Sequence, residues 1–136
     1  MAGKSGARLA RGAWLPQGLL RGAHGTYQLS DQVLGPGLTC IGFGRAPEPY
    51  IGANVADAWR ARGGSMVQIQ ACGEPTPSAG GPAYEDLDRT FSRYVRSDWL
   101  AVVRPDGVLL HDGPLRAASR VLSESLSLLD RYVARS

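Results

Sequence analysis

The sequence predicts a single α/β domain with a central mixed sheet of four strands flanked by helices. Its 136 residues fit one domain, and a hydrophobic content of 43% allows a core without support from disulfides or metals. Short apolar runs bounded by glycine predict strands, and segments with helical spacing lie between them. A long apolar stripe near the end of the chain predicts a final helix of about five turns.

The beginning of the chain lacks a periodic pattern. Residues 1–26 are expected to form a flexible lead-in, because glycine, alanine and arginine dominate and residues 15–18 (L-P-Q-G) favour a turn. The folded domain is therefore predicted to span residues 27–136. Its first element is one short helical turn over residues 30–35.

The first half of the domain predicts a strand, a helix and a second strand. Residues 38–43 form an apolar run typical of a buried parallel strand. Asn54 is expected to cap a helix whose apolar side contains Trp59, and Gly63 is expected to end it. Residues 66–71 alternate between apolar and polar side chains, which predicts the second strand.

The second half is expected to begin with a surface loop over residues 73–82. The spacing of Leu87, Phe91 and the residues after it predicts a helix over residues 84–94. Residues 99–103 predict a third strand, and the R-P-D-G sequence that follows predicts a tight turn into a short antiparallel strand over residues 108–110.

The final helix is expected to start at Asp112 or Gly113, with Pro114 in its first turn. Right-handed crossovers make the first two strands parallel, whereas the R-P-D-G turn makes the last two antiparallel. Strand, helix, strand, helix, strand, hairpin, strand and helix is the element order of a thioredoxin-like domain.

Composition and charge exclude several classes of partner. The net charge is +3, and four basic residues precede the first acid, Asp31, so the lead-in carries more than the surplus. No clustered basic patch favours nucleic acid, and no apolar run approaches the ~20 residues of a membrane span. A cytoplasmic location is expected, in which Cys40 and Cys72 remain reduced and buried as small apolar residues.

No catalytic, cofactor-binding or metal-binding residue is expected. A redox-active thioredoxin carries its nucleophilic cysteine after the first strand, at the start of a helix. Residues 44–50 occupy that position and contain no cysteine, so the C-x-x-C motif is absent. The glycines around Phe43 do not make a dinucleotide fingerprint, and His24 and His111 do not make a metal site.

Three segments resemble the C-terminal domain of FAD-dependent aromatic hydroxylases, in the branch of 3-(3-hydroxyphenyl)propionate hydroxylase and phenol hydroxylase. They are residues 15–18, residues 29–43 (L-S-D-Q-V-L-G-P-G-L-T-C-I-G-F) and residues 99–107 (W-L-A-V-V-R-P-D-G). The resemblance implies a thioredoxin-like domain without redox cysteines. FAD and NAD(P)H are implied only for a larger related enzyme, because the family's flavin and substrate motifs lie upstream of this domain.

The leading hypothesis is therefore a non-catalytic structural or interaction domain. Its expected partner is a second copy of itself or a flavoprotein hydroxylase, and the expected contacts are Arg116 and Arg120 on the last helix and the loop over residues 73–82. One alternative is a stand-alone domain that binds a small ligand or has acquired an enzymatic role. Another is a thiol-based redox protein that uses Cys40 and Cys72.

Overall fold

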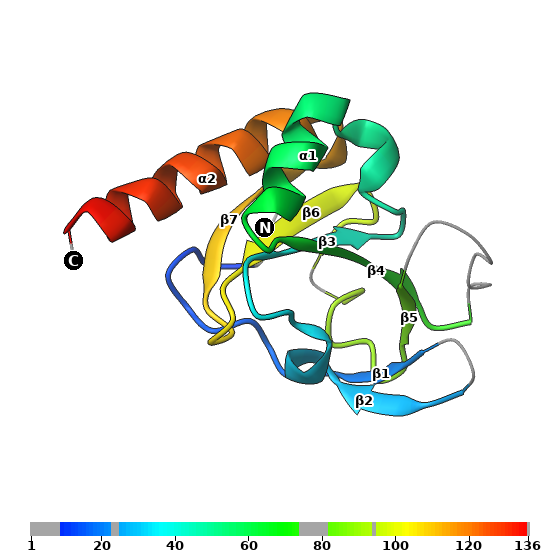
Figure 1. The fold of residues 1–136 in the computed structure, drawn as a ribbon. Coiled ribbons are helices and arrows are strands. Elements are labelled where there is room, and N and C mark those ends of the chain that lie inside the picture. Colours follow the sequence, from blue (N-terminus) through cyan, green and yellow to red (C-terminus); the bar gives the residue numbers. More distant parts are fainter. Residues whose placement is uncertain (1–8, 23–24, 74–81, 94, 136) are drawn as a thin grey trace.

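The computed structural model describes residues 9–22, 25–73, 82–93 and 95–135. Within these residues, one mixed sheet of seven strands forms the centre of the molecule (Figure 1). Across the sheet the strands are β2 (Tyr27–Leu29), β1 (Leu19–Arg21), β5 (Ala83–Asp86), β4 (Ser65–Ala71), β3 (Thr39–Phe43), β6 (Trp99–Val103) and β7 (Leu109–Pro114). The central strands β3, β4 and β5 are parallel, and all the other neighbours are antiparallel.

Two α-helices lie on the same face of the sheet (Figure 1). They are α1 (Ala53–Ala61) and α2 (Ala118–Arg135), and the 3-10 turn η3 (Leu115–Ala117) leads from β7 into α2. Apolar side chains from both helices pack against this face around the fully buried Trp59, whose Nε1 donates a 3.0 Å hydrogen bond to the carbonyl of Ser65. The core on this face comprises Leu38, Cys40, Ile51, Ala56, Trp59, Leu100, Val102, Leu115, Ala118, Val121 and Leu122.

The opposite face carries a second core that no α-helix of the described residues covers. Its buried members are Leu20, Ile41, Phe43, Val67, Ile69, Phe91, Val95, Ala101, Val103 and Leu109. The side chains of β3 and β6 alternate between the two cores, as a pleated strand requires: Cys40 faces the helices and Ile41 faces away from them. Turns and short segments therefore shield this second face.

The structure confirms the four predicted strands and their directions. They correspond to β3, β4, β6 and β7, and β3 is parallel to β4 whereas β6 and β7 are antiparallel. The first predicted helix is also present as α1, with Trp59 buried and Gly63 at its end with a φ of +79°. Its N-cap is Gly52, so Asn54 lies inside the helix.

The helix predicted over residues 84–94 is wrong, because residues 83–86 form strand β5 and turns follow it. Asp86 Oδ2 accepts hydrogen bonds from the amides of Phe91 and Ser92, and Asp88 Oδ1 accepts one from the amide of Thr90. These side chains hold the backbone in turns that compete with a continuous helix. Phe91 is still buried. The apolar spacing therefore predicted the burial of this side chain correctly, but it did not predict the conformation of the backbone.

The sheet has seven strands where four were predicted, and it begins before the expected domain boundary at residue 27. Strand β1 comes from the predicted lead-in, and it pairs with both β2 and β5. Residues 12–15 also pair with residues 107–109, next to β7. The final helix starts later than expected, because β7 continues to Pro114 before η3 and α2 begin.

Candidate functional site

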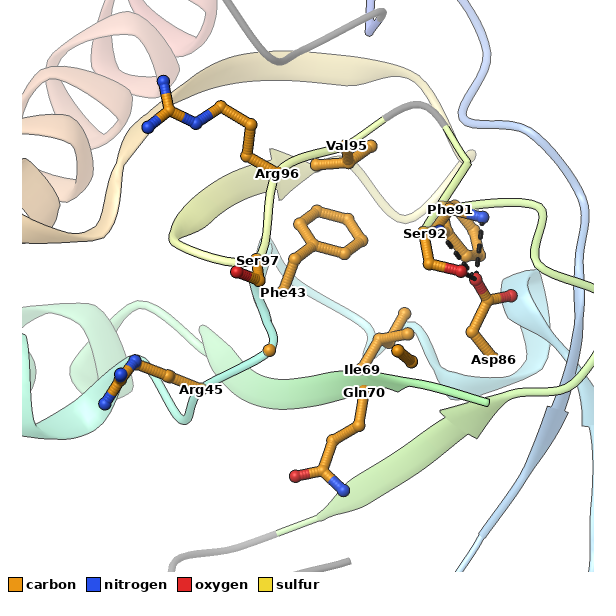
Figure 2. A pocket seen from close by; sticks show the side chains of 12 residues that line it. Phe43, Arg45, Ile69, Gln70, Asp86, Phe91, Ser92, Val95, Arg96 and Ser97 are labelled. Carbon is orange, nitrogen blue, oxygen red and sulfur yellow. Dashed lines mark hydrogen bonds between the residues drawn. The ribbon is translucent and has the colours of Figure 1, made fainter. Parts of the chain in front are cut away.

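A pocket opens at the edge of the sheet where the parallel strands end. Strands β3, β4 and β5 run in the same direction, so their carboxyl ends meet at this edge, which is where open α/β sheets commonly bind ligands. The pocket has a volume of about 610 Å³ and lies on the face without α-helices. Figure 2 shows Phe43, Ile69, Phe91 and Val95 around it.

The pocket walls are held in place by the chain around Gly44 and Asp86. Gly44 has a φ of +84°, and its amide donates a 2.8 Å hydrogen bond to the carbonyl of Ile69. The rings of Phe43 and Phe91 lie 5.6 Å apart between centroids. Asp86 is fully buried, and its Oδ2 accepts bonds of 3.0 and 2.7 Å from the amides of Phe91 and Ser92 (Figure 2). These contacts place Phe91 over the end of β3.

The two cysteines are free thiols in different environments. Cys40 lies within β3 with no exposed surface, and burial raises the pKa of its thiol to about 12, far from the thiolate that disulfide exchange requires. Cys72 is exposed, which corrects the expectation that both thiols are buried, and both cysteines are free. Residues 44–50, after β3, carry no thiol.

The glycines near the pocket do not fit a flavin or dinucleotide cofactor. In a dinucleotide site, glycines leave room for the pyrophosphate to approach the backbone. Here the space that a side chain would fill at Gly42 is already occupied by the carbonyl of Arg45 and by Pro47, and the space at Gly44 is occupied by Ser97. These glycines allow the chain to pack closely against itself, so they supply no cradle for FAD or NAD(P)H.

Metal coordination has no support among the described residues, in which no group of three His, Cys, Asp or Glu side chains could hold a metal ion. His111 lies on β7, and its Nε2 is 2.8 Å from Oε1 of Glu124 on α2. His24 lies outside the described residues. Within the described part of the chain, no helix combines the length and apolar composition that a bilayer crossing requires.

Exposed apolar side chains gather on the β1–β2 hairpin. Leu19 and Leu29 are directly opposite each other across the two strands, and Tyr27 lies opposite Arg21 on the same face. The exposed fractions are 38% for Leu19, 43% for Leu29 and 63% for Tyr27. We call Leu19, Tyr27 and Leu29 the hairpin patch. Each strand has only three residues, so sequence periodicity could not reveal this patch.

The contacts expected from the sequence lie elsewhere. Arg116 in η3 and Arg120 in α2 are both exposed, and the structure places them at the start of the final helical region. Most of the loop over residues 73–82, which was expected to contribute to contacts, lies outside the described residues. Neither arginine belongs to the pocket or to the hairpin patch.

Solved structures with a similar fold include a flavin-dependent monooxygenase, a peroxidoxin and a domain of a possible thiol-disulfide isomerase. The flavin-dependent monooxygenase PieE, in a crystal structure with FAD and substrate, matches with a TM-score of 0.59 and 21% identity, over 86% of this chain and 20% of that chain. Peroxidoxin BcpB from Mycobacterium tuberculosis matches with a TM-score of 0.63 and 14% identity, over 88% of this chain and 98% of that chain. A domain of a possible thiol-disulfide isomerase from Cytophaga hutchinsonii matches with a TM-score of 0.63 and 14% identity, over 94% of this chain and 98% of that chain.

At these identities the structural matches show the fold alone, which is thioredoxin-like. The chain spans 20% of the length of PieE and resembles its C-terminal region. A search of curated protein sequences found no match. A family model described as the HcaD C-terminal domain matches residues 12–127, which is well over half of the chain. The chain therefore belongs to the HcaD C-terminal domain family.

Proposed function

We propose that this chain is a non-catalytic structural and interaction domain that acts with a flavin-dependent aromatic-ring monooxygenase in the cytoplasm. Membership in a family of C-terminal domains supports this proposal, as does the resemblance to part of a flavin-dependent monooxygenase. The flavin, NAD(P)H and aromatic substrate would be bound by the larger flavoprotein, because the space beside Gly42 and Gly44 near the pocket is filled by the chain's own backbone and side chains.

The hairpin patch is the observation that carries the proposal. Single exposed apolar residues are common on protein surfaces, but contiguous ones mark interaction sites. Leu19 and Leu29 are direct cross-strand neighbours, and Tyr27 continues the row on the same face. Tyrosine is enriched in protein interfaces, since it offers a large apolar ring with a polar end. The outer strand β2 also leaves one backbone edge unpaired among the described strands.

The position of the patch favours a flavoprotein as its occupant. Related domains are named for the C-terminal part of their protein, so the remainder of such a protein precedes the domain. Of the five large hydrophobic residues that are exposed in the described chain, four lie between residues 14 and 29, which is the part nearest to that remainder: Trp14, Leu19, Tyr27 and Leu29. A flavin- and substrate-binding unit that packs on the β1–β2 hairpin would cover Leu19, Tyr27 and Leu29.

The test is to isolate the tagged chain from its native cells, at its native level, and to record the absorbance spectrum of the isolated material across the flavin region. We expect a flavoprotein in stoichiometric amount, and we expect the double variant Tyr27→Ser/Leu29→Ser to lose it. Tyr50→Ser is the matched control, because Tyr50 is 37% exposed but lies outside the patch. Arg116→Ser/Arg120→Ser tests the second proposed contact.

Each outcome separates the candidate functions. A colourless chain that no flavoprotein accompanies would contradict the proposal. A colourless dimer that Tyr27→Ser/Leu29→Ser converts to a monomer in light scattering would assign the patch to a second copy of the chain. A stoichiometric flavin that remains bound to the chain alone would show that the domain has its own cofactor. Loss of the flavoprotein only in Arg116→Ser/Arg120→Ser would move the interface to α2.

A further inference from the structure

A second hollow lies where three separate segments of the chain meet. Its walls come from residues 14–17, from the 3-10 turn η1 (Ser30–Val33) with the residue after it, and from the R-P-D-G turn. It shares no lining residue with the pocket at the carboxyl edge of the sheet. We call it the Trp14 hollow, and it is lined by Trp14, Leu15, Gln17, Ser30, Asp31, Leu34, Asp106 and Gly107.

Hydrogen bonds fix two of these segments against each other. Oε1 of Gln17 accepts a 2.9 Å bond from the amide of Asp31 and a 2.8 Å bond from the hydroxyl of Ser30. Ser30 is buried, and its hydroxyl oxygen also accepts a 2.9 Å bond from the amide of Gly18. Asp31 is therefore held at the wall of the hollow by the segment that carries Trp14.

Trp14 is held in place although it is 74% exposed. Its backbone forms a β-bridge with Val108, and the amide of Leu15 donates a 2.7 Å hydrogen bond to the carbonyl of Gly107. The indole ring lies against the same glycine, since a Cβ atom at Gly107 would be 3.5 Å from Cε3 of Trp14. An indole ring that is fixed before binding loses little conformational entropy when a ligand packs on it, and indole is the aromatic ring that attracts cations best.

The hollow carries negative charge. Asp31 and Asp106 line it, and none of the residues described there is basic. Asp106 is already engaged, because its carboxylate is paired with Arg104 and accepts a 3.2 Å bond from the amide of Val108. The carboxylate of Asp31 is exposed and has no hydrogen-bond or ion-pair partner among the described residues. A solvated carboxylate alone indicates no ligand, but a carboxylate and an exposed indole at one hollow favour a cation.

We infer that the Trp14 hollow receives an arginine side chain of the protein that covers the hairpin patch. The guanidinium binds the carboxylate of Asp31 and packs on the ring of Trp14, and its alkyl stem lies along the apolar part of the lining. Arginine fits better than lysine, because a planar guanidinium can both stack on a ring and make paired hydrogen bonds to a carboxylate.

The size and the position of the hollow favour a side chain of a partner protein over a free ligand. Its volume is about 270 Å³, whereas small-molecule sites usually measure about 300–1,000 Å³. Leu29 of the hairpin patch is followed directly in the chain by Ser30 and Asp31, so one partner surface can reach both. The identity of the partner rests on the proposed function, whereas the preference for a guanidinium rests on the hollow alone.

The first experiment tests this preference on the full chain without a partner. The probe is N-acetyl-arginine amide, and N-acetyl-citrulline amide is its uncharged counterpart of nearly the same shape. NMR follows the amides of Asp31 and Gly107 and the indole of Trp14. We expect the arginine probe to shift these resonances with a Kd on the order of 10 mM. The citrulline probe is expected to bind roughly fivefold more weakly, because it lacks the charge.

Two variants and a control make this result specific. Asp31→Asn and Trp14→Ala are each expected to weaken the arginine probe roughly fivefold, as judged from the Gly107 amide. Both residues are exposed, so the fold should persist. Asp57→Asn, which removes an exposed acid on α1, is expected to change nothing. Equal binding of the two probes, or equal behaviour of Asp31→Asn and Asp57→Asn, would overturn the guanidinium site.

The second experiment uses the flavoprotein isolated with the tagged chain. Asp31→Asn is expected to raise the Kd of this complex roughly fivefold, whereas Asp57→Asn should leave it unchanged. If Asp31→Asn binds as tightly as the wild type while Tyr27→Ser/Leu29→Ser does not bind, the inference is wrong and the proposed function stands. If the wild-type chain carries no flavoprotein, the proposed function is wrong, and the two probes alone decide whether the hollow binds a guanidinium.

Discussion

The guanidinium of Arg21 lies 2.6 Å from Oε1 of Glu85, and this ion pair joins the antiparallel strands β1 and β5. The amide of Gly73 donates a 2.7 Å hydrogen bond to the other carboxylate oxygen. The Gly73 amide and then the Arg21 guanidinium hold the pKa of Glu85 below its ordinary value of 4.5. The hairpin patch is carried by β1 and β2, so this pair fixes the patch to the rest of the sheet.

The first prediction concerns the pH dependence of stability. Because the pKa of Glu85 is lower in the folded chain than in the unfolded chain, its stabilising effect is complete above about pH 4.5 and is lost as the pH falls through the lower folded value. We expect Glu85→Gln to unfold at a lower urea concentration than the wild type at pH 7, and the gap to close in acid. Asp57→Asn, an exposed acid on α1, serves as the control. A gap that stays constant down to pH 2 would contradict this account.

The second prediction concerns the close approach at Gly44. Gly63 and Gly44 both have positive φ values, but a side chain at Gly63 would meet nothing within 4 Å, whereas one at Gly44 would collide with Ser97. We expect Gly63→Ala to lower the free energy of unfolding by about 1–2 kcal/mol, from backbone conformation alone. Gly44→Ala is expected to cost about 2 kcal/mol more, from the added steric conflict. If urea denaturation gives the same loss of unfolding free energy for both variants, the chain around Ser97 moves aside without cost.

The third prediction concerns thiol reactivity. A thiol-specific disulfide reagent is expected to modify one cysteine per folded chain, because Cys72 is exposed while Cys40 is buried and its thiol has a pKa of about 12. Cys72→Ser should remove the fast reaction, and the second thiol should react only after unfolding in urea. Rapid modification of two cysteines in the folded chain would mean that β3 opens readily.

The fourth prediction compares two tryptophans in opposite environments. Trp59 is fully buried and Trp14 is 74% exposed. We expect Trp59→Ala to lower the free energy of unfolding by about 3–5 kcal/mol, since it opens a large cavity under α1. Trp14→Ala is expected to change it by no more than about 0.5 kcal/mol. A large loss in Trp14→Ala would indicate that the pairing of residues 12–15 with residues 107–109 is a major source of stability.

The parts of the fold that could be predicted from the sequence are those whose burial pattern is local. Strand β3 is buried on both sides, so its unbroken apolar run was visible. Strand β5 was missed because Glu85 and Asp86 make it look like a surface helix, although both carboxylates are buried. Their burial depends on Arg21 and on the amides of Phe91 and Ser92, which only the tertiary structure supplies.

The candidate site also has features that depend on local sequence and features that depend on tertiary structure. The absence of a redox motif could be predicted, because it depends on the identities of residues 44–50 alone. The pocket could not, since it exists only where turns bring Phe91 and Val95 over the end of β3. One of its lining residues, Arg45, lies in the loop that would carry the cysteines of a redox thioredoxin, and no sequence pattern indicates that this loop borders a pocket.

Because both α-helices lie on one face, the two cores differ in how they can open. Residues 87–93 and 95–98 lie beside the second core in turns, and few of the hydrogen bonds described for them belong to a regular element. Amide hydrogens in this segment should exchange with solvent through local openings, at a rate above that of the amides of β3 and β6, which need global unfolding. Such an opening would lift Phe91 and Val95 away from Phe43 and Ile69. Hydrogen exchange would therefore distinguish the two cores, although both pack on the same strands.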